Sequence, residues 1–572
     1  MEMSMKLITA GPGSGKTQRL ASDIQDRLDE GVSPYMIMAT TFTREAAREI
    51  AERLGGEVSI RTVHGLGYWL IRLARRVRGE VVPRVISEEK AMAVMERAAK
   101  ELDVKFIEPR RAMDDMARIR ERGGRLETLH PQVQHVIERY FEILSSENLM
   151  DFTGILDEAR KELADPDLQA FLQGQHLFVD EGQDISPVTE WPILEVLMKG
   201  SCEFVMFASP SQQIYGFRGA CWEKLCSLFP EDLTIETMNQ NHRSTPEIIR
   251  AASPLAGPDA DTMVPVKESL GIPVLAVDVM NPEMEADFVG RQIAEWLDQG
   301  IEAKEIAVLA RVHSMLNIIQ MALRMRNIPF QIVGGRKSLF HREEAQAVLG
   351  YLRLALDPMD DTVLESVIDY PPCGIGTRTR NELRRDGYLT WDHLFGALAH
   401  PNKFRKQVIS RIHRILDLRE YFEEVVRSGL PLMQAIARII ELSEIPTYLN
   451  SEGDFQATIA LNDLLKLSVE FPSLNRFIEY LDAEVRRPRE VEGVQLSTLH
   501  ASKGREFCGV IIPGFQDGVI PLDGSELQEE QNLAFVGMTR AKYRLVLTLN
   551  RSLPPSRFLS KLPVQVALWP PH

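Results

Sequence analysis

Cysteines and long apolar runs are scarce in this chain. Its 572 residues include 5 cysteines, and no two of them stand as Cys-x-x-Cys. A disulfide framework, a zinc ribbon and an iron–sulfur cluster are therefore not expected, and a reducing compartment fits best. No apolar run is long enough to cross a bilayer, and the chain enters its first expected strand without a signal peptide, so we expect no membrane partner.

Positive charge is also in short supply. The chain has 66 Lys and Arg against 82 Asp and Glu, a formal net charge of −16. Net charge governs solubility and non-specific attraction, whereas a nucleic-acid groove needs only local basicity. The acidic balance therefore weakens the expectation of a DNA partner without excluding one. A hydrophobic content of 44% is typical of globular proteins, and the length predicts roughly three to five domains.

Residues 6–17 combine a short apolar run, a glycine-rich turn and a Gly-Lys-Thr triplet that leads into a helical pattern. This order predicts a phosphate-binding loop between strand and helix, because glycines let backbone N–H groups turn inward on a phosphate. Lys16 would reach the β- and γ-phosphates of a nucleotide, and Thr17 would place its hydroxyl on Mg²⁺. The loop residues expected to surround the phosphates are Gly11, Gly13, Ser14 and Gly15. Ala10 replaces the first glycine of the usual pattern, so a merely flexible loop is the alternative.

Strand and helix patterns alternate in two regions of the chain. Such alternation is typical of a parallel sheet with nucleotide at the carboxyl ends of its strands. In residues 76–148, and again from 378 to 490, the strand signals stop and helical patterns remain. The sequence therefore predicts two α/β domains, each interrupted by a helical insertion. The expected boundaries are 1–75 with 149–240 for the first domain, 76–148 for its insertion, 241–377 with 491–572 for the second domain, and 378–490 for its shorter insertion.

Two adjacent carboxylates, Asp180 and Glu181, follow the apolar run 176–179. In a phosphate-loop enzyme the first would hold Mg²⁺, and the second would orient or deprotonate the attacking water. An Asp-Glu pair alone is common at the start of loops. After a strand and downstream of a phosphate loop, however, it is a strong indication of nucleotide hydrolysis.

Further segments resemble, in family order, the motifs of the UvrD/Rep/PcrA family of DNA helicases. The segments that carry the resemblance are 41–49, 62–65, 151–152, 212–220, 240–244, 498–506 and 529–541. The resemblance covers nearly the whole chain. It implies an α/β fold of two RecA-like P-loop motor domains, each interrupted by a mainly helical insertion.

The same resemblance implies an ATP-dependent 3′→5′ DNA helicase or translocase that uses ATP and Mg²⁺. Its partners would be single-stranded DNA and duplex junctions, and it would be a cytoplasmic monomer or weak dimer of bacterial or phage origin. Two alternatives stay open: a translocase that strips proteins from DNA without unwinding, and an ATP-gated DNA clamp that does not move.

Site residues follow from the resemblance position by position. The implied catalytic residues are Lys16, Asp180, Glu181, Gln212, Arg243 and Arg540, with Gln212 and the two arginines reaching the γ-phosphate. Glu506 would contact the ribose, and Gln18 and His242 would lie at the base. Phe42, Tyr215 and Phe217 would stack on DNA bases, whereas Thr41, Thr62, His64, Arg218, Thr498 and His500 would lie along the DNA backbone. Core packing is the alternative for each aromatic residue, and most strongly for Phe42.

Several positions depart from the family pattern. Gln18 stands where an arginine is usual and His242 where a tyrosine stacks on the base, and the chain starts too late to carry the family's usual adenine-reading glutamine segment. Base selectivity is therefore open. Residues 209–211 replace an acidic run, and Gln531 and Asn532 replace an arginine pair. Two basic stretches, 105–125 and 403–419, are either ordinary surface helix faces or duplex-binding faces.

Overall fold

The structure is a computed structural model that describes most of the chain. The described residues are 4–104, 109–257, 263–333, 343–368, 370–371, 383, 389–452, 461, 464–465, 467–469, 471–486 and 492–569. Part of each predicted insertion lies outside them: residues 105–108 of the first, and most of 378–388 together with 453–460 and 487–490 of the second. Within these segments no helix has the length and apolarity that crossing a membrane requires.

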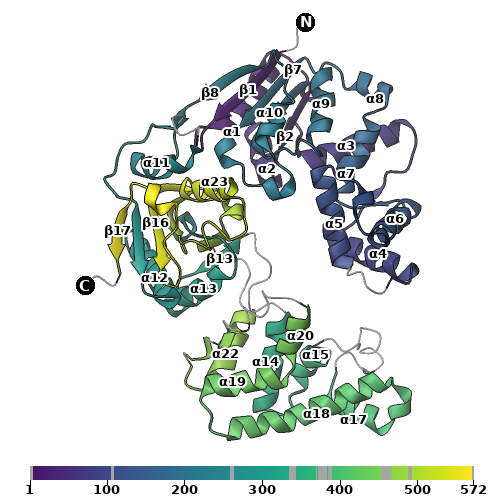
Figure 1. The fold of residues 1–572 in the computed structure, drawn as a ribbon, viewed down its shortest axis with the longest axis vertical. Coiled ribbons are helices and arrows are strands. Elements are labelled where there is room, and N and C mark those ends of the chain that lie inside the picture. The colour runs from purple at the N-terminus through teal and green to yellow at the C-terminus, as the bar shows by residue number, and fades with distance from the viewer. Residues whose placement is uncertain are drawn as a thin grey trace.

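The first large sheet has six strands in the order β3-β2-β6-β7-β1-β8 (Figure 1). Its strands are β1 (Ser4–Ala10), β2 (Ile37–Thr41), β3 (Ile60–Thr62), β6 (His176–Val179), β7 (Glu203–Ala208) and β8 (Thr234–Met238). All neighbouring strands pair in parallel. Buried residues occupy every position of β2 and β7, as expected for strands covered on both faces.

Helices cover both faces of this sheet. They are α1 (Lys16–Asp29), α2 (Arg44–Arg53), α3 (Val63–Val77), α7 (Gly154–Glu162), α8 (Pro166–Phe171), α9 (Trp191–Gly200) and α10 (Trp222–Cys226). Apolar residues of α1 and α2 form one core with the sheet, and those of α3, α7 and α9 form the core on the opposite face. Threonine side chains cap α2 and α3, where Thr43 accepts from the Ala46 N–H and Thr62 from the Gly65 N–H. We call this sheet with its helices the first unit.

A helical group interrupts the first unit between α3 and α7. It contains α4 (Glu88–Glu101), α5 (Pro109–Arg122) and α6 (Pro131–Ser146), which share a core of their own. A short parallel ladder joins β4 (Arg84–Val85) to β5 (Leu149–Met150) where the chain leaves and re-enters the first unit. The sequence did not predict this ladder. Each of its strands has two residues, which is too short to show the alternation of apolar and polar residues by which a strand is recognised.

The second large sheet has seven parallel strands in the order β13-β14-β12-β15-β16-β11-β17. The strands are β11 (Leu275–Val279), β12 (Ile306–Ala310), β13 (Phe330–Val333), β14 (Val494–Thr498), β15 (Phe507–Ile512), β16 (Ala541–Asn550) and β17 (Gln565–Leu568). Its helices are α11 (Pro246–Ala252), α12 (Pro282–Asp298), α13 (Met315–Met325) and α23 (Leu527–Met538). We call this the second unit. With both parallel sheets present, the predicted fold class is confirmed.

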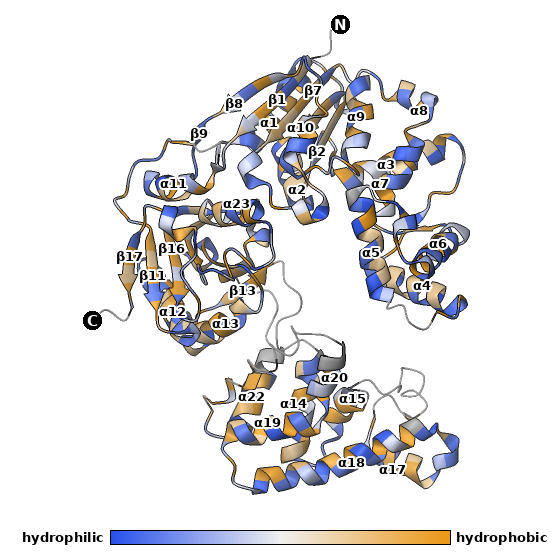
Figure 2. Ribbon diagram, viewed as in Figure 1, coloured by the Kyte–Doolittle hydropathy of each residue, from blue (hydrophilic) through white to orange (hydrophobic). Residues whose placement is uncertain are grey.

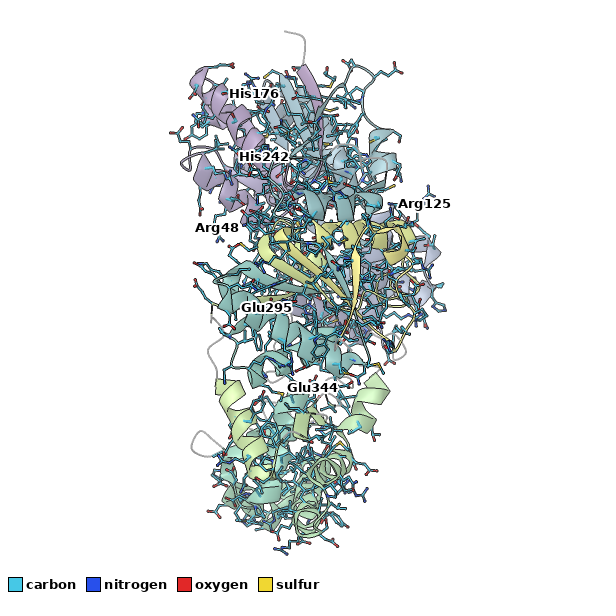
Figure 3. All side chains as sticks on the ribbon, turned by 90° about the vertical axis from the view of Figure 1, so that its left-hand side faces the viewer. Arg48, Arg125, His176, His242, Glu295 and Glu344 are labelled. Carbon is cyan, nitrogen blue, oxygen red and sulfur yellow. The ribbon has the colours of Figure 1, made fainter. Side chains whose placement is uncertain are left out.

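A second helical group separates β13 from β14. It holds α14 (Glu343–Leu356), α15 (Leu364–Val367), α17 (Trp391–Ala399), α18 (Lys406–Arg427), α19 (Leu432–Leu442), α20 (Ile445–Glu452) and α22 (Leu474–Arg486). Glu344, near the start of α14, lies where this group meets the second unit (Figure 3). Residues of α14 pack in one core with α18 and α22, although α14 precedes residue 378, where the sequence predicts the insertion to begin.

The basic stretch 403–419 lies largely on α18. Blue and orange alternate along this helix in Figure 2, as an amphipathic helix requires. Arg411 is buried and donates to the Tyr351 hydroxyl at 2.9 Å and to the carbonyl oxygens of Val367 and Tyr370 at 2.8 and 2.7 Å. This cation therefore holds the helical group together and does not face a duplex.

Candidate active site and DNA-binding surface

The phosphate loop lies between β1 and α1, as predicted. Gly13 and Gly15 have φ of 69° and 84°, in the left-handed region that favours glycine. Ser14 Oγ donates to the Gly11 carbonyl at 2.8 Å, and Lys16 is buried with Nζ 3.5 Å from that same oxygen. No side chain caps the first turn of α1, so its N–H groups stay open to an anion.

The two predicted carboxylates follow β6 directly. Asp180 is buried, and burial together with the adjacent Glu181 raises its pKa to about 7. Burial also opposes the charge of Glu181, but the neighbouring Lys503 and Lys16 hold the pKa of this carboxyl below its ordinary value. Glu181 has a φ of 55°, uncommon for a residue with a side chain, which is typical of strained functional positions.

Arg243, one of the two predicted arginines, lies against the phosphate loop. Arg243 Nε donates to Glu506 Oε2 at 2.7 Å. A Cβ on Gly13 would lie 2.6 Å from the Arg243 Cβ, so this loop and this arginine are in close contact. The His242 N–H donates to the Gly13 carbonyl at 2.8 Å, and Asn241 Nδ2 donates to the Pro12 carbonyl at 2.6 Å.

Arg540 is buried without a carboxylate partner among the described residues. Its guanidinium donates to the carbonyl oxygens of Val536 at 2.9 Å and Arg505 at 3.2 Å, and to the Thr539 hydroxyl at 3.3 Å. Burial and the nearby Arg243 lower its pKa to about 9. A buried cation in this state is stabilised by an anion brought from outside.

The phosphate loop and the residues around it fit a nucleoside triphosphate. Gln212 is buried, and its Nε2 has no hydrogen-bond partner in the described part of the chain. Phosphate oxygens would accept hydrogen bonds from the Gln212 Nε2 donor and from the loop amides. They would also supply the negative charge that Arg540 lacks among its described partners. No cluster of three or more His, Cys, Asp or Glu suited to a metal occurs within the described segments.

Lys503 was missed as a site residue. It follows the short 3₁₀ turn His500–Ser502 of the second unit and forms a short ion pair with Asp184 of the first. Its Nζ lies 3.0 Å from the Gln212 carbonyl, 3.7 Å from Glu181 Oε2 and 5.3 Å from the Tyr215 ring centroid. Its place inside the segment 498–506 was the only signal that the sequence offered.

Predicted DNA-backbone contacts gather around one cavity of about 420 Å³. Four of the six residues predicted along the DNA backbone line it, namely Thr41, Thr62, His64 and Arg218. Phe42, which was predicted to stack on a base, lines it as well. His64 stacks on Phe152 with ring centroids 4.4 Å apart and planes 7° apart. Burial and the nearby Arg218 lower the pKa of His64 to about 4, so the imidazole is neutral at pH 7.

The predicted base-stacking residues form a chain of rings that leads from the first unit to the second. Phe42 stacks on Tyr215 at 4.5 Å, Tyr215 meets Phe217 edge-on at 6.0 Å, and Phe217 meets His500 at 5.9 Å. Phe217 is 59% exposed, so it is not a core residue. Thr498, at the end of β14, lies two residues before His500 in the chain and accepts from the Ala501 N–H at 3.3 Å.

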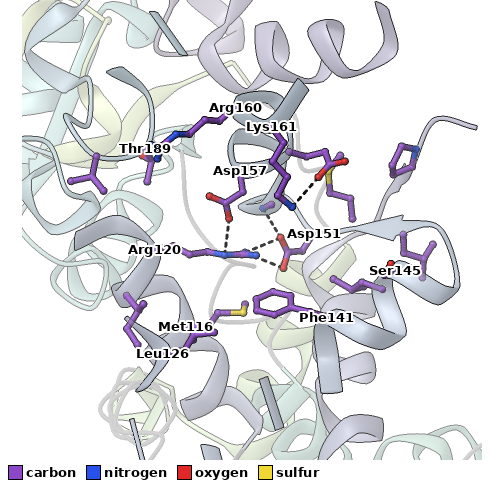
Figure 4. Close-up of a pocket in the computed structure, with 18 of the residues that line it drawn as sticks. Met116, Arg120, Leu126, Phe141, Ser145, Asp151, Asp157, Arg160, Lys161 and Thr189 are labelled. Carbon is purple, nitrogen blue, oxygen red and sulfur yellow. Dashed lines mark hydrogen bonds and ion pairs between the residues drawn. The ribbon is translucent and has the colours of Figure 1, made fainter. Parts of the chain in front are cut away.

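A second cavity, of about 950 Å³, lies between α5, α6 and α7 (Figure 4). Arg120 crosses it and pairs with Asp151 and Asp157, both at 3.1 Å. Asp151 also accepts from the Tyr140 hydroxyl at 2.8 Å and from the Gly154 N–H at 2.6 Å. This cluster fastens the first helical group to the first unit, so part of the predicted basic stretch 105–125 serves packing.

Two parallel sheets, with a phosphate loop on one and arginines of the other facing it, define a two-domain P-loop nucleoside triphosphatase. Comparison with known proteins narrows this class. Residues 2–231 match the UvrD/REP helicase N-terminal domain, and residues 237–552 match the UvrD-like helicase C-terminal domain. The chain belongs to the UvrD-like helicase family and is an ATP-dependent DNA helicase.

Relatives of known name agree with this assignment. The chain is 29% identical to DNA helicase II of Escherichia coli over 97% of its length and 85% of the relative. It is 29% identical to DNA helicase II of Salmonella typhimurium, over 98% of its length and 85% of that protein. It is 27% identical to the ATP-dependent DNA helicase PcrA of Staphylococcus epidermidis, over 97% and 84% of the two chains.

Proposed function

We propose that this helicase couples hydrolysis of Mg²⁺-bound ATP to 3′→5′ movement along single-stranded DNA and to unwinding at duplex junctions. The observation that supports it most is that Arg243 of the second unit lies against the phosphate loop of the first, while Lys503 of the second unit pairs with Asp184 and lies 3.7 Å from Glu181. Hydrolysis that needs both units together depends on closure of the cleft between them. The direction of movement rests on the family resemblance alone.

The residues at the nucleotide would have three roles: phosphate binding, activation of the attacking water and Mg²⁺ binding. Lys16 and the loop amides of residues 11–15 would hold the phosphates, and Glu181 would orient the attacking water and accept its proton. Thr17 and Asp180 would hold Mg²⁺, which when bound neutralises charge on the phosphate oxygens.

Three further residues would act on the transferred phosphoryl group. Gln212, Arg243 and Arg540 would stabilise its charge in the transition state, where an arginine contributes on the order of 10³–10⁵ in rate. Glu506 pairs with Arg243 in this structure. When nucleotide binds, Arg243 would leave Glu506 and turn toward the phosphate, and Glu506 would contact the ribose.

Single-stranded DNA would lie over the ring chain and the adjoining cavity. Stacking on Phe42, Tyr215 or Phe217 would contribute about 1–3 kcal/mol per base without sequence preference. Phe42 and Tyr215 stack on each other here, so a base would take the place of one ring. Neutral His64 and His500 would offer hydrogen bonds, while Arg218 would supply the charge and make affinity fall with salt.

We also propose the domain division that the sequence predicts: motor domains 1–75 with 149–240 and 241–377 with 491–572, and insertions 76–148 and 378–490. In this division α14 precedes the second insertion in sequence and packs against its helices α18 and α22.

Two substitutions test the assigned chemistry. Lys16→Ala and Glu181→Gln should each abolish DNA-stimulated ATP hydrolysis. Glu181→Gln should still bind nucleotide, because it removes the water-orienting carboxylate and leaves the phosphate loop intact. Wild-type turnover in Glu181→Gln would overturn the assignment.

A further inference from the structure

One loop of the first unit carries both a nucleotide contact and DNA contacts. We call residues 212–222 the coupling loop. Its first residue, Gln212, carries the unpaired amide at the nucleotide site, and Tyr215 and Phe217 belong to the ring chain at the DNA surface. Any displacement of this loop therefore changes both sites together.

Side chains of the second unit form hydrogen bonds with main-chain atoms of the coupling loop. Lys503 Nζ donates to the Gln212 carbonyl at 3.0 Å, and Asn532 Nδ2 donates to the Gln213 carbonyl at 3.0 Å. Glu529 Oε1 accepts from the Gly216 N–H at 3.1 Å. Asn532 and Glu529 lie on α23, so one helix of the second unit holds the loop at two points.

The approach of α23 to the loop depends on a glycine. A Cβ built on Gly216 would lie 2.9 Å from Glu529 Oε2, too close for an unshifted carboxylate. Main-chain contacts of this kind fix the position of the loop without occupying its aromatic side chains. Tyr215 and Phe217 therefore stay available for bases while the loop is held.

The coupling loop is also braced internally. The Gln213 side chain donates to the Ala220 carbonyl at 3.2 Å and accepts from the Trp222 N–H at 3.0 Å. The Arg218 N–H donates to the Tyr215 carbonyl at 2.9 Å. Because hydrogen bonds join the start of the loop to its end, a displacement of the Gln213 carbonyl would displace the whole loop.

We propose that Asn532 and Glu529 are positioning residues that transmit movement of the second unit to the base-stacking rings Tyr215 and Phe217. The inference rests on the proposed motor function and adds the residues that link cleft closure to DNA movement. The hydrogen bonds that both side chains make to the coupling loop end on its main chain, not on Gln212 or on a ring. Their loss should therefore change how far the protein moves for each ATP, not whether it hydrolyses ATP.

The chain supplies a matched control one residue away. Gln531 Nε2 donates to the Leu255 carbonyl at 3.1 Å, a contact within the second unit, whereas the equivalent amide of Asn532 crosses to the first. Asn532→Asp keeps side-chain size and the oxygen that accepts from Gln528, but it removes the donor to Gln213. Gln531→Glu likewise replaces an amide by a carboxylate, but it affects the contact with Leu255 within the second unit.

The experiment compares wild type, Asn532→Asp and Gln531→Glu in three measurements: ATP hydrolysis without DNA, hydrolysis with single-stranded DNA, and translocation rate to a labelled DNA end. Nucleotides moved per ATP should fall by about threefold or more in Asn532→Asp, the effect expected for one lost interdomain hydrogen bond. Hydrolysis without DNA should stay within about twofold of wild type in both variants, and Gln531→Glu should move normally.

A second pair of variants covers the case in which Asn532→Asp does not fold. Glu529→Ala removes the acceptor for Gly216, whereas Glu529→Gln keeps an oxygen there, so Gln should restore most of the movement per ATP that Ala loses. Equal behaviour of Asn532→Asp and Gln531→Glu, or equal loss of hydrolysis with and without DNA, would overturn the inference. A wild-type protein that does not translocate would instead refute the proposed function.

Discussion

Replacing Lys503 with methionine should separate a structural role of this residue from a catalytic one. The substitution keeps the side-chain volume but removes the cation between Asp184 and Glu181. Asp184 has a fully buried side chain, and removing one partner of a buried ion pair costs about 3–5 kcal/mol. Glu181 lies 3.7 Å from Lys503 Nζ, a distance at which the attraction amounts to about 4 kcal/mol at an effective dielectric constant of about 20.

The two losses should respond differently to a second substitution. Asp184→Asn removes the buried charge that Lys503→Met leaves without a partner, so the double variant should regain most of the lost thermal stability. It does not restore the cation beside Glu181 or the donor to the Gln212 carbonyl. We therefore expect DNA-stimulated turnover to stay at least about a hundredfold below wild type in both Lys503→Met and the double variant, equivalent to about 2.7 kcal/mol in the barrier.

The assay is DNA-stimulated ATP hydrolysis together with the thermal unfolding midpoint of four proteins: wild type, each single variant and the double variant. It should be run at pH 8, above the value of about 7 to which burial raises the Asp184 pKa, so that this carboxyl is charged in the reference protein. A double variant with restored turnover would show that Lys503 only balances Asp184. Turnover within threefold of wild type in Lys503→Met would refute the catalytic role altogether.

Four other outcomes follow from the site. Phe217→Ala should reduce translocation more than DNA-independent hydrolysis, and equal losses of both would indicate core packing. GTP should support DNA-stimulated hydrolysis within roughly tenfold of ATP, about 1.4 kcal/mol, because Gln18 and His242 are both exposed; an ATP preference of about a hundredfold would contradict this. Burial lowers the pKa of His64 and His500 to about 4, so single-strand affinity should not rise between pH 8 and pH 6, and a rise would contradict their neutral state. The fold should instead lose stability as pH falls from 6.5 toward 4, because the unfolded chain takes up protons that the folded histidines exclude.

Local patterns were sufficient to predict most of the fold. Parallel strands buried on both faces give short apolar runs, and β6 coincides with the apolar run 176–179 that the sequence shows. The two-residue strands β4 and β5 were missed because they are shorter than any period. The packing of α14 with α18 and α22 was not predicted, since these helices are distant from α14 in the sequence.

The site shows the same division between local and distant contacts. Lys16, Asp180 and Glu181 were predicted because strand, turn and charged residue follow one another in the chain. Lys503 and Asn532 act on residues about 300 positions away, and no periodicity links them to Asp184 or Gln213. The mutual stacking of Phe42 and Tyr215 likewise depends on how two loops meet, which a single sequence does not encode locally.

Unwinding of a partial duplex with a single-stranded tail tests the central claim most directly. Wild type and Glu181→Gln should be compared on duplexes that carry either a 3′ or a 5′ tail, with and without ATP. The account predicts ATP-dependent strand separation by wild type on the 3′-tailed duplex, little on the 5′-tailed one, and none by Glu181→Gln. Separation only of the 5′-tailed duplex, or DNA-stimulated hydrolysis with no separation of either, would contradict it.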